Sequence, residues 1–158
     1  MLQTLLSWAW IFISGYLWGI MGLRLLNGRG GKCKDVDVVL VFGLCVLTVY
    51  AQLFSLFSAV SFWAFALLGL GCIVISFLLR EELGHIWRGY FRKRYIWLWL
   101  ALVGILALAG AQLLTRGALQ YDTYLYHAQS IRWIEEYGVA PGIGNLHNRL
   151  AYNSSFFC

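Results

Sequence analysis

Charged residues are scarce in this sequence. Asp, Glu, Lys and Arg make up 12% of its 158 residues, whereas 61% are hydrophobic and the mean hydropathy is +0.71. A soluble domain of ordinary composition carries about 25% charged residues, which cover its water-facing surface. The composition therefore excludes an ordinary water-soluble domain and indicates a protein that is solvated by the lipid bilayer.

Cysteine, proline and known catalytic motifs are also sparse. The four cysteines are scattered without a CxxC spacing, so the sequence predicts neither a zinc site nor a disulfide framework. No GxSxG, HExxH, phosphate-loop or kinase signature occurs. The net charge of +5 does not indicate nucleic-acid binding, because the basic residues flank apolar runs and form no patch with interleaved aromatic residues.

Long apolar runs dominate residues 1–115 and predict about four membrane-spanning helices. The first run, residues 2–26, is long enough to cross a hydrocarbon core of roughly 30 Å. It lacks a basic leading region and exceeds the apolar core of a signal peptide, which predicts a retained helix. The run 38–79 is about twice the length of one span, so it predicts two helices with a turn near residues 57–61, where serines cluster. The predicted spans are residues 2–26, 38–57, 60–79 and 95–114.

The distribution of basic residues predicts the orientation in the membrane. Nine of the twelve Lys and Arg residues lie in or beside residues 27–37 and 80–94, both of which are predicted to be loops. The second of these is charged and amphipathic. The positive-inside rule assigns both loops to the cytoplasm, which leaves the N-terminus and residues 116–158 outside. The sequence thus predicts a multi-pass protein of the inner (plasma) membrane.

The tail, residues 116–158, is more polar than the spans and is predicted to be extracytoplasmic. A helix is expected to begin at Asp122, an N-cap residue, and to stop at Gly138, before a turn around Pro141. Residues 151–158 look like the beginning of another apolar segment. We therefore expect the chain to be the N-terminal part of a longer protein, or a truncated copy. The predicted fold class is all-α, a polytopic transmembrane helical bundle with a C-terminal interfacial helical segment.

One face of the tail helix carries side chains that suit a carbohydrate. Positions 122, 126, 129 and 133 recur at helical spacing and place Asp122, Tyr126, Gln129 and Trp133 on one side. Polar groups can hydrogen-bond sugar hydroxyls, and a sugar can stack on aromatic rings. The same pattern is also typical of a helix that lies in the membrane interface without binding a sugar. Spacing alone leaves both interpretations open.

Several tail residues have more than one predicted role. Asp122 could cap the helix, act as a general base with a raised pKa at the membrane boundary, or ligate a divalent cation. Arg149 could pair with a phosphate or anchor the chain at the interface. His127 and His147 could contact sugar or phosphate, or act as ordinary surface residues. The residues proposed to bind substrate are Tyr126, His127, Gln129, Trp133, Asn145, His147, Arg149 and Asn153.

The tail resembles an uncharacterised family of bacterial polytopic membrane proteins over about residues 120–157. Its members carry Asp-x-x-x-Tyr-His, then Gly-Val-x-Pro-Gly-x-x-Asn-Leu-His-x-Arg and Asn-Ser-Ser, between hydrophobic helices. Here these positions are Asp122, Tyr126, His127, Gly138, Val139, Pro141, Gly142, Asn145, Leu146, His147, Arg149, Asn153, Ser154 and Ser155.

More distantly, the arrangement is similar to the C-type glycosyltransferases, which use polyprenyl-phosphate-linked sugars. That resemblance implies a catalytic role for Asp122, the matching position by topology. Such enzymes have eight or more spans, so the 158 residues alone are not expected to be active. The leading hypothesis is the N-terminal part of a glycosyltransferase-like enzyme of cell-envelope polysaccharide assembly. The alternatives are a transporter or flippase component and a truncated, non-catalytic membrane protein. The expected partners are the lipid bilayer and a polyprenyl-phosphate-linked sugar, without nucleic acid.

Overall fold

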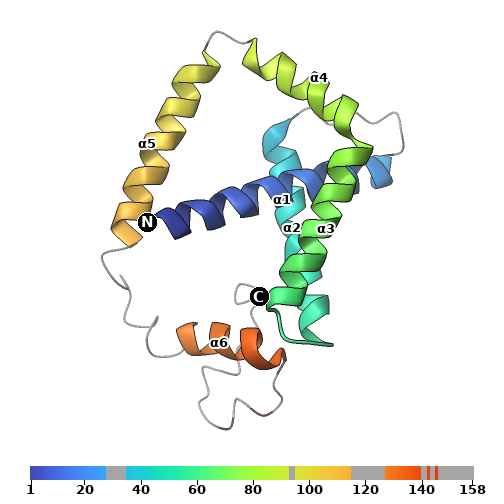
Figure 1. Cartoon of the computed structure of the whole chain (residues 1–158), viewed down its shortest axis with the longest axis vertical. Helices are drawn as coiled ribbons and strands as arrows, with labels where there is room; N and C mark the ends of the chain where they lie inside the picture. The colour runs from blue at the N-terminus through green and yellow to red at the C-terminus, as the bar shows by residue number, and fades with distance from the viewer. Residues whose placement is uncertain (28–34, 93–94, 115–126, 140–141, 143–144, 146–158) are drawn as a thin grey trace.

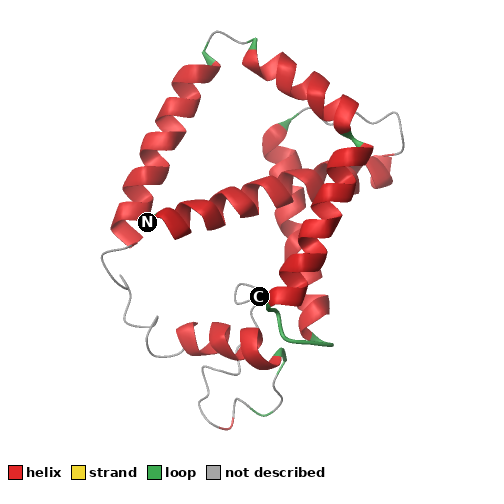
Figure 2. Cartoon of the chain, in the orientation of Figure 1, coloured by secondary structure: helices red, strands yellow, loops and turns green. Residues whose placement is uncertain are grey.

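The computed structural model describes residues 1–27, 35–92, 95–114 and 127–139, together with Gly142 and Asn145. All regular structure in these ranges is helical, and no strand occurs among them (Figure 2). The prediction of an all-α fold is confirmed for this part of the chain. The helices are α1 (Leu2–Asn27), α2 (Val36–Ser55), α3 (Phe62–Leu78), α4 (Arg80–Phe91), α5 (Ile96–Leu114) and α6 (Ala128–Tyr137).

Three helices, α1, α2 and α5, are long and apolar enough to cross a membrane. The 17-residue α3 is followed after a bend of 80° by α4, and the pair could supply a fourth span. All four apolar helices overlap the ranges predicted from the sequence. The turn expected near residues 57–61 is also present, because α2 ends at Ser55 and α3 begins at Phe62.

The prediction of a loop over residues 80–94 is wrong, since residues 80–91 form α4. Acidic Glu81 and Glu82 occupy the first turn of α4 and Arg88 the last, which matches the helix dipole. Leu83 and Ile86 recur at helical spacing and pack on the hydrophobic core. The high density of charge indicated a loop, although the same residues have an amphipathic pattern. In Figure 1, α4 runs from the end of α3 towards α5.

Close approach of backbones holds α1 against α2, its main partner. A methyl group on Gly43 of α2 would collide with the carbonyl oxygen of Gly15 in α1. One turn along α1, a methyl group on Gly19 would collide with the carbonyl of Val39. Gly15 and Gly19 form a GxxxG pattern, which allows two helices to approach closely inside a membrane.

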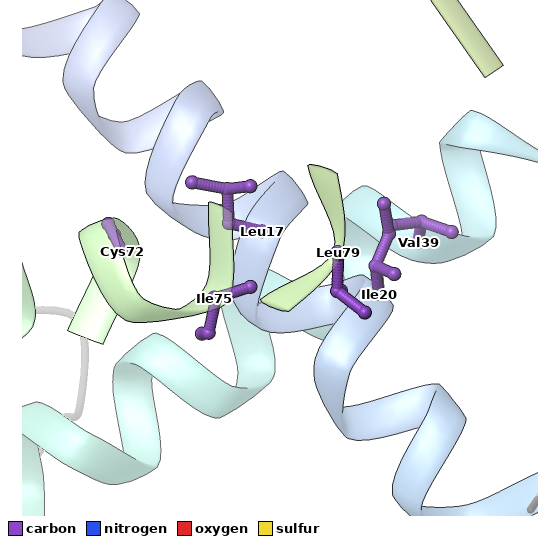
Figure 3. Packing of buried hydrophobic residues seen from close by; sticks show 6 residues of the cluster. All are labelled: Leu17, Ile20, Val39, Cys72, Ile75 and Leu79. Atoms are coloured by element: carbon purple, nitrogen blue, oxygen red, sulfur yellow. The ribbon is translucent and has the colours of Figure 1, made fainter. Parts of the chain in front are cut away.

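The core lies where α1, α2 and α3 meet (Figure 3). Leu17 and Ile20 come from α1, Val39 from α2, and Ile75 from α3. Closer to the turn between α2 and α3, the Tyr50 hydroxyl of α2 donates a 2.8 Å hydrogen bond to the backbone carbonyl of Ala64 in α3. Core packing and this hydrogen bond join the three helices. The buried cluster consists of Leu17, Ile20, Val39, Cys72, Ile75 and Leu79.

Most other apolar side chains are exposed on the outside of the helices. Helix α5 contacts the rest of the described chain mainly where Trp8 of α1 meets Gly110, beside the buried Ala111. Its remaining surface exposes large residues such as Trp97, Leu106 and Leu108. Apolar surface of this extent is typical of contact with lipid. The external surface of the protein is thus suited to the hydrocarbon core of a bilayer.

Candidate functional site

The candidate site is built where α6 meets the turn between α2 and α3. We call this contact between residues 55–61 and 127–139 the turn–tail junction. The backbone N–H of Val60 donates to the carbonyl of Ile134 over 3.1 Å, and the N–H of Val139 donates to the carbonyl of Ser55 over 3.0 Å. These bonds hold α6 beside the ends of α2 and α3, as Figure 1 shows.

Gly138 makes the junction possible. Its φ of 71° ends α6 in a conformation that L-residues rarely adopt, and its N–H donates to the carbonyl of Ile134 over 3.1 Å. The residue is buried, and a Cβ at this position would lie 2.7 Å from the Ser55 carbonyl oxygen and 2.9 Å from that of Ser58. The predicted helix stop at Gly138 is confirmed. The lack of a side chain at residue 138 also lets α6 approach the turn.

The structure brings two of the predicted substrate-binding residues together. Gln129 and Trp133 lie one turn apart on the same side of α6; Gln129 is exposed and Trp133 half-buried. His127 is half-buried immediately before this helix. Asn145 is exposed, and its backbone N–H donates to the carbonyl of Gly142 over 2.9 Å. The other predicted site residues lie outside the described residues: Asp122, Tyr126, His147, Arg149 and Asn153.

An ion pair lies on the same side of α6 as Gln129 and Trp133. The Arg132 Nε donates to the Glu136 Oε1 over 2.8 Å, and this hydrogen bond raises the pKa of Arg132. Positions 129, 132, 133 and 136 have i, i+3, i+4 and i+7 spacing, so these four side chains share one face. We call Gln129, Arg132, Trp133 and Glu136 the polar face of α6. It combines an amide, an ion pair and an indole ring.

Comparison with known proteins assigns a family. The model of a family described as a domain of unknown function (DUF8201) matches residues 1–158. The chain belongs to the DUF8201 family. No curated protein and no solved structure matches it.

Sequence reasoning missed two members of the polar face in this DUF8201 protein. Arg132 and Glu136 lie outside the predicted set of positions 122, 126, 129 and 133. The signal that could have found them was their i,i+4 spacing, which is common for helical ion pairs. Nothing comparable in the sequence indicates the role of Ser55 and Val60, because they contribute only backbone atoms to the junction.

The described part of the DUF8201 chain contains no group of three or more His, Cys, Asp or Glu residues that could hold a metal ion. The sequence also predicts that Asp122 could ligate a divalent cation, but Asp122 lies outside the described residues. The polar face itself can offer hydrogen-bond donors and acceptors to a ligand, with a ring surface for stacking. Chemically, this arrangement is suited to the recognition of a polar ligand.

Proposed function

We propose that this DUF8201 protein is a four-span protein of the inner membrane. We further propose that it is the N-terminal part of a glycosyltransferase-like enzyme of cell-envelope polysaccharide assembly. The observation that carries the proposal is the turn–tail junction, because it fixes the polar face of α6 beside the ends of two apolar helices. A lipid-linked sugar would present its sugar at that level of a membrane.

Contacts at the opposite ends of α3 support the orientation. At one end, the Arg24 guanidinium in the last turn of α1 lies 3.1 Å from the Glu82 carboxylate in α4. This ion pair joins the last turn of α1 to the first turn of α4. Most of the basic residues lie next to these turns in the sequence, in residues 27–37 and 80–94. At the other end lies the turn–tail junction. The 17 residues of α3 separate the two ends by about 25 Å, close to the thickness of a hydrocarbon core.

The positive-inside rule then favours a cytoplasmic position for the basic end and an extracytoplasmic position for α6 and the N-terminus. The bent pair of α3 and α4 is one span followed by a helix outside the hydrocarbon, since Arg80, Glu81 and Glu82 follow the apolar α3 directly. This gives four spans, α1, α2, α3 and α5.

The proposed chemistry divides the tail residues by role. Asp122 acts as the general base or ligates a divalent cation. His127 and His147 contact sugar or phosphate, and Arg149 holds the lipid-linked phosphate. Gln129 and Trp133 of the polar face bind the sugar by hydrogen bonding and stacking, with Tyr126, Asn145 and Asn153 as further polar contacts.

Binding and transfer of a sugar test this proposal. The natural full-length protein is reconstituted in nanodiscs with a radiolabelled polyprenyl-phosphate-linked hexose. Trp133→Ala is expected to weaken binding on the order of tenfold, from a stacking contribution of about 1 kcal/mol together with lost apolar contact. Asp122→Asn is expected to abolish transfer of the hexose and to retain binding. Trp99→Ala, an exposed tryptophan of α5, is the matched control and should bind as the wild type does.

Two outcomes would contradict the proposed function. Equal binding of the hexose by the wild type and by Trp133→Ala would show that Trp133 of α6 does not contribute to sugar binding. Transfer by Asp122→Asn at the wild-type rate would remove the catalytic role of Asp122.

The sidedness has its own test. Gln129→Cys in α6 and Gly89→Cys in α4 both introduce thiols at exposed positions. In intact cells a membrane-impermeant maleimide is expected to label the first, and in inverted vesicles the second, above the wild-type background. Labelling of both thiols from the same side would contradict the four-span topology.

The transporter alternative receives no specific support from the polar groups of the spans. The Ser14 hydroxyl donates to the carbonyl of Trp10 over 2.7 Å, and the Thr48 hydroxyl donates to that of Leu44 over 2.8 Å. Both hydroxyls thus bond to their own helix, as is common for Ser and Thr in membrane helices. We therefore put forward only the glycosyltransferase-like function.

A further inference from the structure

Helix α4 has two chemically different sides. Its apolar side lies on the rest of the protein: Leu83 and Ile86 pack against the core, and the Trp87 ring lies 6.1 Å from that of Tyr16 in α1. The opposite side carries polar and charged residues, among them Arg88 and Arg92, which are exposed. The apolar side of α4 is therefore half-buried against the protein, and the polar side faces the surrounding phase.

The bend at Leu79 sets the direction of α4. Its axis turns by 80° from that of α3, so it runs nearly perpendicular to that apolar helix. If α3 crosses the bilayer, α4 must leave the hydrocarbon and run along the membrane surface. Figure 1 shows this change of direction. An amphipathic helix in that orientation lies among the lipid headgroups.

Charge is distributed unevenly along α4. The acidic residues lie at its start, where Glu82 is already paired with Arg24. The segment 88–94 has four basic residues and no acidic one. Its basic residues are Arg88, Arg92, Lys93 and Arg94. The C-terminal half of α4 therefore begins a cluster of positive charge, which is complementary to anionic lipid.

Aromatic rings accompany this basic cluster. The Trp87 and Phe91 rings stack with centroids 5.8 Å apart, and the Phe91 ring lies 5.6 Å from that of Trp97 at the start of α5. Trp97 is 63% exposed, so the row of rings reaches the surface of the protein. Tryptophan is enriched at the level of the lipid headgroups. Rings and basic side chains together fit the interface of a membrane.

We propose that the C-terminal half of α4 is a binding surface for the headgroups of anionic phospholipids. Arg88 and Arg92 bind the headgroup phosphates. The Arg88 Nε donates to the carbonyl of Gly84 over 3.0 Å, which leaves the terminal nitrogens of its guanidinium for a phosphate. The proposal rests on the span assigned to α3 above, whereas the leaflet concerned depends on the proposed orientation.

Lipid selectivity tests this surface. The full chain is reconstituted in phosphatidylcholine bilayers with spin-labelled phosphatidylglycerol or spin-labelled phosphatidylcholine. Electron spin resonance then gives the association constant of the first lipid relative to the second. The wild type is expected to prefer phosphatidylglycerol. Arg88→Gln/Arg92→Gln is expected to lower that preference on the order of tenfold, because each basic residue near an anionic surface contributes severalfold to binding.

Two further variants separate charge from folding. Arg88→Lys/Arg92→Lys keeps the charge and should retain most of the preference. Gly104→Ala in α5, where a methyl group would meet nothing within 4 Å, should leave the preference unchanged. A ratio near one for the wild type would overturn the proposal. An equal preference in the wild type and in the double glutamine variant would do the same.

The outcome is separable from that of the proposed function. Lipid selectivity requires no sugar and no Asp122, so it can persist when transfer fails. If thiol labelling shows the opposite orientation, the preference for phosphatidylglycerol should remain, and the binding surface of α4 is then assigned to the other leaflet.

Discussion

At the scale of single residues, Gly43 is decisive for the contact between α1 and α2. Its Cα faces the carbonyl of Gly15, and even a methyl group would collide with that backbone. Gly43→Ala is expected to destabilise the fold by about 1–3 kcal/mol, the usual cost of overpacking. The apparent Tm in detergent should fall by several degrees, measured by thermal denaturation followed by circular dichroism.

Gly104 of α5 provides the matched control. A methyl group there would meet nothing within 4 Å. Gly104→Ala should leave the Tm unchanged or raise it, because alanine has the higher helix propensity. An equal fall in both variants would show that the loss of glycine, rather than the helix crossing, determines stability.

At the turn–tail junction, Gly138 allows the same kind of close backbone contact that Gly43 allows between α1 and α2. Gly138→Ala combines a positive φ, which costs alanine about 1–3 kcal/mol at the ψ of −142° found here, with a clash against the carbonyls of Ser55 and Ser58. The junction should open, and amide hydrogen exchange at Val60 and Val139 should accelerate. Gly89→Ala in α4, where a methyl group meets nothing within 4 Å, should leave this exchange unchanged. Unaltered exchange in Gly138→Ala would contradict the role of Gly138.

At the scale of elements, the ion pair between Arg24 and Glu82 joins the last turn of α1 to the first turn of α4. Both side chains are about 40% exposed, at 39% and 41%. Glu82→Gln is therefore expected to lower the free energy of unfolding by no more than about 1 kcal/mol. Chemical denaturation at low and high salt measures it, and the difference from wild type should shrink at high salt because exposed charges are screened.

Glu81 is the matched control for this pair. It lies beside Glu82 in α4 and is exposed. Glu81→Gln should cost less than Glu82→Gln. If Glu81→Gln costs as much, the negative charge at the start of α4, rather than the ion pair, is what stabilises the helix.

At the scale of the whole molecule, the apolar surface determines where the protein can exist. The described core contains only nine buried hydrophobic residues, whereas large apolar side chains are exposed along α1, α2, α3 and α5. Water cannot solvate such a surface without aggregation. The chain is expected to remain in the membrane pellet after alkaline carbonate extraction and to enter solution only with detergent. Release into the carbonate supernatant would contradict the membrane assignment.

The sequence by itself determined which segments are helical and apolar. Runs of apolar residues set the positions of α1, α2, α3 and α5, because hydrocarbon requires every backbone polar group to bond within its own helix. The serine-rich turn and the stop at Gly138 also followed from local chemistry. In the candidate site, spacing predicted that Gln129 and Trp133 share a face.

Only the tertiary structure decided which helices meet. Solvation by lipid has no direction, so hydropathy separates spans from loops without pairing them. The contact of α1 with α2 depends on the absence of a side chain at Gly19 and Gly43. The junction depends on backbone groups of Val60 and Ile134, which are far apart in the sequence. Packing of Leu83 on the core likewise fixed α4 as a helix, where its density of charge alone had indicated a loop.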